Sequence, residues 1–101
     1  MEDLAREYAK RIRTRLGPRV KEVRLFGSRA RGDAREYSDY DVLVVLDQRS
    51  PELRAEILDI GARMMDQYGI LVATVLRSVE EWRGSQGYPF ARNIARESIA
   101  L

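Results

Sequence analysis

Two aspartates, Asp39 and Asp41, stand immediately before the most hydrophobic run of the chain, Val42 to Leu46. That run is short, β-branched and bounded by polar residues, which favours a buried strand over a helix. Side chains two residues apart on a strand point to the same face, so a strand that begins near Asp39 would project both carboxylates together. Such a pair repels itself unless a cation lies between them, and a divalent metal is the usual one.

A glycine and a serine upstream offer groups of a different kind. An apolar segment ends at Gly27 and Ser28, and a short helical segment over 29–31 follows. The first amides of a helix have no partner within it, and the positive end of the helix dipole lies there, so both suit a phosphate. Gly27 allows close approach of the backbone, and the Ser28 hydroxyl adds a donor. Phosphate donors that face a carboxylate pair indicate a site for a nucleoside triphosphate with Mg²⁺.

A plainer interpretation is a polar loop between two strands, with Gly32 and Asp33 as turn residues and the aspartates as solvated charges at a strand end. Each residue taken alone fits that interpretation well. The whole set, in this order and at these strand edges, favours the site.

Hydrophobic periodicity and capping signals predict the elements that must hold this site, in the order α-β-α-β-α-β-α. They are a helix over 2–16, strands over 20–26, 39–47 and 70–76, the short segment 29–31, a helix between Ser50 and Gly69, and a last helix over 90–97. A short helix that carries Trp82 precedes the last one. The buried stripe predicted for the long helix is Leu53, Ile57, Ile60, Met64 and Tyr68. Gly61 is expected to let that helix approach the sheet closely.

The connections between the predicted strands indicate an α/β (α+β) fold, a small mixed β-sheet with helices packed against it. About a dozen residues join the first two strands, which favours an antiparallel pair, whereas a helical crossover allows the second and third strands to be parallel. At 101 residues we expect one domain, 1–101.

Composition excludes several classes of chemistry. The chain has no Cys and no His, which removes disulfides, thiol nucleophiles, imidazole catalysis and most zinc sites. A net charge of +2 gives no strong signal for nucleic acid, and no apolar run approaches the roughly 20 residues of a membrane span. The N-terminus does not read as a signal peptide, so we expect a cytoplasmic protein.

The pattern G-S-x-A-x-G, followed by S-D-x-D and an apolar strand, resembles the nucleotidyltransferase superfamily of DNA polymerase β. In so short a chain it is similar to the minimal nucleotidyltransferases (MNT proteins), the antitoxin partners of HEPN toxins. The resemblance covers residues 23–47 closely and the rest of the element order more loosely.

The resemblance implies a role for each residue of the motif. Asp39 and Asp41 would be catalytic ligands of Mg²⁺, with ATP or another nucleoside triphosphate as substrate. Nucleotide and phosphate contacts would come from Gly27, Ser28, Arg29, Arg31 and Ser38. For the two arginines, surface salt bridges are an equal alternative.

One part of the family pattern is missing. Active members usually carry a third carboxylate on the third strand, where this chain has Ala73 or Thr74. Glu80 and Glu81 lie beyond that strand in a capping pattern and are poor substitutes.

Three functional hypotheses follow. The first is an enzyme that transfers AMP from ATP to a HEPN-type helical partner within a hetero-oligomer. The second is a weak or inactive nucleotide-binding antitoxin that acts by forming a complex. The third, an RNA-binding module, is weaker because the aromatic and basic residues are not interleaved. Trp82, Tyr88 and Phe90 would offer a surface to a partner or simply cover the sheet.

Overall fold

The strand β2 (Tyr40–Leu46), whose second residue is Asp41, lies inside the sheet and is buried almost throughout. In the computed structural model, which describes residues 3–36 and 38–101, β2 lies between β1 (Val20–Phe26) and β3 (Val72–Ser78). It pairs antiparallel with β1 and parallel with β3, as the connection lengths predict. A short strand, β4 (Ile99–Ala100), extends the sheet in the order β3-β2-β1-β4. The predicted mixed sheet is confirmed.

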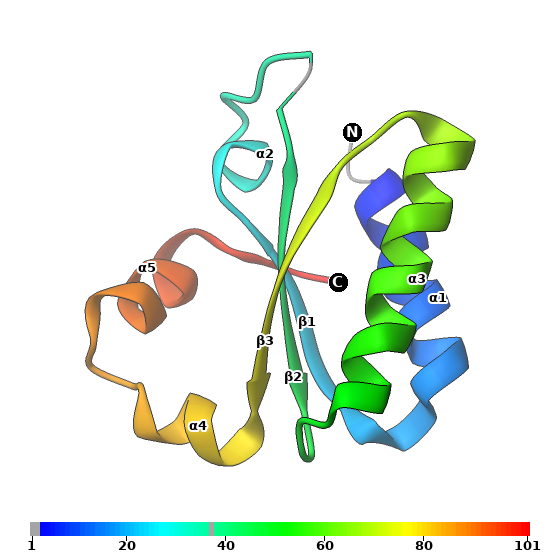
Figure 1. Cartoon of the computed structure of the whole chain (residues 1–101). Coiled ribbons are helices and arrows are strands. Elements are labelled where there is room, and N and C mark those ends of the chain that lie inside the picture. The colour runs from blue at the N-terminus through cyan, green and yellow to red at the C-terminus, as the bar shows by residue number, and fades with distance from the viewer. Residues whose placement is uncertain (1–2, 37) are drawn as a thin grey trace.

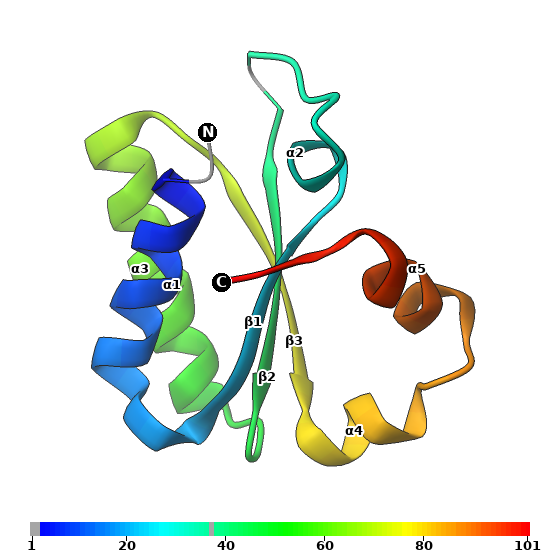
Figure 2. The ribbon, with the colours of Figure 1, turned by 180° about the vertical axis from the view of Figure 1, so that it is seen from behind.

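Helices cover both faces of this sheet (Figure 1). The long helices α1 (Asp3–Leu16) and α3 (Pro51–Tyr68) pack on one face. The shorter helices α4 (Val79–Gly84) and α5 (Pro89–Glu97) lie on the other, and the view from behind shows the same two layers (Figure 2). A 3₁₀ turn, η1 (Gly17–Arg19), leads from α1 into β1.

The alternation along β2 divides the core in two. Val42, Val44 and Leu46 pack with α1 and α3 in the larger cluster, while Leu43 and Val45 pack with Ile94 of α5 in the smaller one. Because side chains alternate along a strand, Asp41 belongs to the face that α4 and α5 cover.

Local signals explain most element boundaries. The side chain of Ser50 accepts a hydrogen bond from the amide of Leu53 at the start of α3, and Gly69 ends that helix in the left-handed conformation, with φ 68°. Ser78 and Glu81 form the capping box that begins α4.

Several expectations about the long helix and the strands are wrong in detail. Tyr68 is not part of the buried stripe, since 42% of its surface is exposed. Gly61 does not approach the sheet, because a Cβ atom built there would meet no atom within 4 Å. The third strand begins two residues later than predicted, at Val72, and β4 is not predicted at all.

Aromatic residues of the C-terminal segment mainly cover the sheet. Phe90 packs edge-on against Phe26 with 5.5 Å between ring centroids, and Trp82 packs edge-on against Phe90 at 6.4 Å. Only Tyr88 projects strongly, with 67% of its surface exposed.

The expectation for Glu2 as the first helical residue lies outside the described residues. Among the described helices, none has the length and apolarity that crossing a bilayer requires.

Candidate active site

The turn after β1 is built around Gly27. Its φ of 74° and ψ of −158° are a conformation that side-chain-bearing residues rarely adopt. The carbonyl of Gly27 accepts hydrogen bonds from the amides of Ala30 and Arg31, both at 3.1 Å. The amides of Ser28 and Arg29 come before these two donors, in the first turn of helix α2 (Ser28–Arg31). The first amides of a helix have no acceptor within it.

Asp41 lies directly against this turn. It pairs across the sheet with Phe26, the residue before Gly27. A Cβ atom on Gly27 would collide with Oδ2 of Asp41. It would also lie 3.1 Å from the Cγ atom and 3.3 Å from the Cβ atom of Asp41. The glycine turn and the strand carboxylate are therefore in van der Waals contact, on the same side of the molecule.

Asp39 shares the electrostatic environment of Asp41. It is exposed and lies just outside β2, one residue before Tyr40, so it does not belong to the strand as predicted. The pKa of Asp41 is raised above its ordinary value, first by burial and then by the negative charge of Asp39, while the positive charge of Arg31 opposes the shift. A bound cation would offset the negative charge that Asp39 places beside Asp41.

Two arginines of α2 point to different groups. Nε and Nη1 of Arg31 lie 3.3 Å and 3.4 Å from the carboxylates of Asp33 and Glu97, and its side chain stays 44% exposed. Arg29 instead donates to the backbone carbonyl of Ser38 and stacks on the ring of Tyr40. The side-chain oxygen of Ser38 accepts a hydrogen bond from the amide of Arg35 at 2.9 Å, which closes a local turn.

The sheet register decides which residue replaces the missing third carboxylate. Ala73 is the partner of Asp41 in the parallel pair of β2 and β3, so the two side chains share a face. Thr74 faces the other way, where its hydroxyl is 2.6 Å from that of Tyr8. Within residues 3–36 and 38–101, no group of three or more acidic side chains is placed to hold a metal ion together. Of the two candidate positions for a third acid, Ala73 is therefore the one that shares a face with Asp41.

The acids beyond β3 do not fill this gap. Glu81 lies in α4, which follows Ser78 at the opposite end of the sheet from Asp41. It is bound there by Arg49 at 2.6 Å, and this partner, followed by the amide of Ser78, lowers the pKa of Glu81 to about 2.

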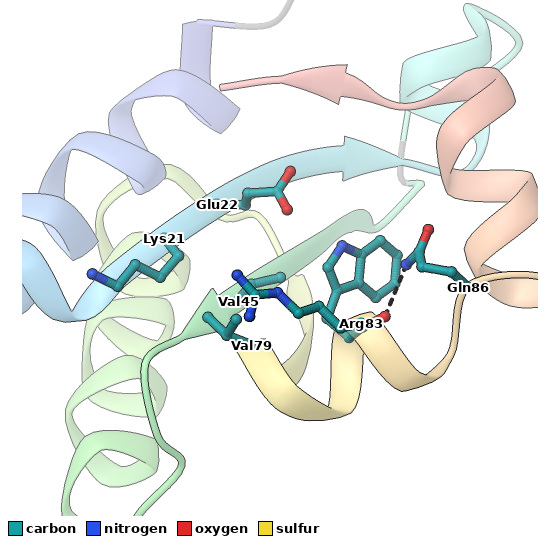
Figure 3. Close-up of a pocket in the computed structure, with 7 residues that line it drawn as sticks. Lys21, Glu22, Val45, Val79, Arg83 and Gln86 are labelled. Carbon is teal, nitrogen blue, oxygen red and sulfur yellow. Dashed lines mark hydrogen bonds between the residues drawn. The ribbon is translucent and has the colours of Figure 1, made fainter.

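A hollow of about 450 Å³ lies between the sheet and α4, away from Asp39 and Asp41. Its lining residues are Lys21, Glu22, Val45, Val79, Trp82, Arg83 and Gln86. Figure 3 shows the extended side chain of Arg83 beside Val45 and Val79. This hollow contains none of the residues that the sequence assigns to the site.

Comparison with known proteins decides the family of this chain. The model of the nucleotidyltransferase domain family matches residues 5–99. The chain belongs to this family. The sequence motif and the fold agree with a nucleotidyltransferase of the minimal type.

Relatives in Methanocaldococcus jannaschii support the same assignment. A candidate protein adenylyltransferase, MJ0604, is 29% identical over 100 residues, which are 99% of this chain and 96% of that protein. A second candidate protein adenylyltransferase from this organism, MJ0141, is 37% identical over 76 residues, or 73% of this chain and 76% of that protein.

Solved structures share the fold. A candidate minimal nucleotidyltransferase superposes with a TM-score of 0.65 at 29% identity, over 99% of this chain and 94% of that one. A toxin–antitoxin structure with AMP-PNP has a TM-score of 0.61 at 17% identity, over 93% and 69%. A tri-AMPylated Shewanella oneidensis HEPN toxin in complex with its MNT antitoxin gives 0.56 at 16% identity, over 99% and 71%.

Proposed function

We propose that this nucleotidyltransferase binds ATP with Mg²⁺ between the Gly27–Ser28 turn and the carboxylates of Asp39 and Asp41, and transfers AMP to a partner protein. The observation that carries the proposal is the contact between Asp41 and Gly27. This contact places a carboxylate, which can act as a metal ligand, beside a turn whose amides suit phosphate. A triphosphate bridged by a metal needs both within reach of each other.

The residues present fit a hard divalent cation. Asp39 and Asp41 offer only oxygen ligands, which Mg²⁺ prefers, and the raised pKa of Asp41 reflects a charge that a cation would stabilise. A Mg²⁺ ion bound there would neutralise part of the negative charge on the triphosphate. Asp39 and Asp41 would be its protein ligands.

The other residues of the turn act on the phosphates. The Ser28 hydroxyl and the first amides of α2 would donate hydrogen bonds to the β- and γ-phosphates, and Gly27 leaves space for them. Arg31, whose charge is felt at Asp41, would offset negative charge on the nucleotide. Ser38 closes the turn that precedes Asp39.

The transfer itself requires an acceptor hydroxyl. Its oxygen forms a bond to the α-phosphorus, the bond from that phosphorus to the bridging oxygen breaks, and pyrophosphate leaves. Ala73 stands where the family usually has an acid, so this chain provides no carboxylate there to take the hydroxyl proton. The proton therefore passes to a base of the acceptor protein or to water.

A HEPN-type helical protein is the partner that we propose, in a hetero-oligomer in the cytoplasm, where ATP is available. Two observations support it. The relatives are named as candidate protein adenylyltransferases, and one structural neighbour is an MNT antitoxin whose HEPN toxin carries AMP. The role of antitoxin in such a pair is part of the proposal.

A second candidate function rests on Ala73. If the third acid is essential, the protein binds nucleotide weakly or without turnover and neutralises its partner by complex formation alone. The register of Ala73 opposite Asp41 is the observation that favours this alternative.

Incubation of the protein with ATP labelled on the α-phosphate, Mg²⁺ and a co-expressed HEPN-type partner separates the two. Label on the partner that disappears in Asp39→Asn and Asp41→Asn supports transfer. The matched control is Asp66→Asn, which removes an exposed carboxylate of α3 and should keep full labelling. A tight complex that carries no label, and that both site variants leave intact, would establish the alternative.

A further inference from the structure

The side chain of Arg29 is directed at the backbone of the loop that carries Asp39. Its Nε and Nη2 atoms donate to the carbonyl of Ser38 at 3.0 Å and 2.8 Å, and Nη2 also reaches the carbonyl of Glu36 at 3.3 Å. The guanidinium carbon lies 4.0 Å from the centre of the Tyr40 ring, which is buried. The guanidinium thus donates to the carbonyls of Glu36 and Ser38 and stacks on Tyr40, so all these partners lie close to Asp39 in the chain.

These contacts fix the residues on both sides of Asp39. The carbonyl of Ser38 belongs to the same planar peptide group as the amide of Asp39, so holding one orients the other. On the other side, the amide of Tyr40 donates to the carbonyl of Leu71 at 2.9 Å, and its ring lies under Arg29. Asp39 itself is exposed and outside β2, so the strand ladder does not orient it.

Arg29 also belongs to α2, next to Ser28. It therefore connects the turn proposed for phosphate with the loop proposed for metal, and holds them at a set separation. We propose that Arg29 is a positioning residue that fixes Asp39 relative to the Gly27–Ser28 turn, an inference that rests on the proposed nucleotide site. Of the two arginines of α2, we assign the phosphate contact to Arg31, which would exchange its partly exposed ion pairs with Asp33 and Glu97 for it.

Lysine cannot reproduce this arrangement. A guanidinium is planar, so it can stack on an aromatic ring while two of its donors meet one carbonyl, whereas an ammonium is a point charge on a flexible chain. A contact with phosphate that depended mainly on charge would tolerate lysine better. Arg29→Lys therefore distinguishes a positioning role from a phosphate contact, and Arg29→Ala removes both.

The first measurement uses no ligand. The NMR order parameter of the Asp39 amide, measured by relaxation in the free protein, should fall in both Arg29→Lys and Arg29→Ala and stay unchanged in Arg63→Ala. Arg63 is a suitable control because it forms an exposed i,i+4 ion pair with Asp59 on α3. An unchanged order parameter at Asp39 in Arg29→Ala overturns the positioning role.

The second measurement is the Mg²⁺ concentration at which ATP raises the melting temperature half-maximally. Loss of an outer residue that orients a metal ligand typically costs roughly 10- to 100-fold in metal affinity, so both Arg29 variants should need that much more Mg²⁺. A loss of ATP binding in Arg29→Ala that is the same with and without Mg²⁺, and that Arg29→Lys restores, overturns the proposal in favour of a phosphate contact. If the unmodified protein shows no response to ATP with Mg²⁺, the proposed function fails, and the order parameter at Asp39 still decides the role of Arg29.

Discussion

The carboxylate of Asp41 lies against the α-carbon of Gly27, so close that a methyl group on that carbon would collide with Oδ2. The contact joins the end of β1 to the start of β2, because Asp41 pairs with Phe26. It is also the point where the proposed phosphate turn and the proposed metal ligand meet.

Gly27→Ala should disturb the fold and the site together. The alanine would have to adopt φ near 74° and displace Asp41, and strained backbone of this kind costs about 1–3 kcal/mol. For a domain of this size each kcal/mol lowers the melting temperature by roughly 4–8 °C. Thermal unfolding measures the loss, and the rise produced by ATP with Mg²⁺ should disappear as well. A variant that retains the full rise would show that this close approach has no part in the site.

Gly61→Ala is the matched substitution at a glycine that has neither a positive φ nor a close side-chain neighbour. Gly61 lies within α3, and its added Cβ would meet no atom within 4 Å. Alanine is preferred to glycine in a helix interior by about 0.5–1 kcal/mol, so this variant should be more stable and should bind ATP unchanged. Chemical denaturation gives the free energy of unfolding directly. A destabilised Gly61→Ala protein would mean that this face of α3 is packed against something in solution.

The contrast between these glycines shows how far the sequence could lead. The motif around Gly27 and its fit to a phosphate turn are visible in the residue order, because special backbone conformations have local signals. The space around Gly61 depends on how a helix sits on a sheet, which no local pattern encodes. The same limit applies to β4, a strand of two residues that exists only through its pairing with β1.

Side-chain partners across a loop are also beyond local pattern. Both arginines of α2 could be read as phosphate ligands, and only the folded loop shows Arg29 on the Ser38 carbonyl and the Tyr40 ring. Tyr40 is missing from the predicted site for the same reason. The third-strand position was ambiguous between Ala73 and Thr74 until the parallel register set Ala73 beside Asp41.

Ala73→Asp should restore the acid that the family pattern has and this chain lacks. The new carboxylate would share a face with Asp41, where it could accept the proton of the acceptor hydroxyl. A positioned general base contributes on the order of 10² to 10⁴ in rate, so transfer of labelled AMP to the partner should rise by at least about tenfold. Ala73→Asn, of the same shape without the charge, is the control. Equal rates for the two variants would mean that the missing acid does not limit this protein.

Asp41→Asn should stabilise the metal-free protein at neutral pH. The pKa of Asp41 is raised in the folded state, so above its unfolded value of 3.8 the unfolded chain binds fewer protons and stability falls as the pH rises. Removing the charge removes this cost. Since the side chain is only partly buried, the gain should stay below about 1 kcal/mol.

Melting temperatures in EDTA from pH 3 to pH 8 test this sign. The asparagine variant should melt higher than the unmodified protein at pH 7, and the difference should vanish below about pH 3.8, where both forms are neutral. A variant that is less stable at pH 7 would indicate that the Asp41 charge has a favourable partner in the folded protein.

A crystal structure of the protein with Mg²⁺ and a non-hydrolysable ATP analogue tests the nucleotide site most directly. The account predicts Mg²⁺ bound by carboxylate oxygens of Asp39 and Asp41 at about 2.0–2.1 Å, with the β- and γ-phosphates on the amides of the Gly27–Ser28 turn. A nucleotide bound elsewhere, for example in the hollow beside Trp82, or a metal without a bond to either aspartate, would contradict it.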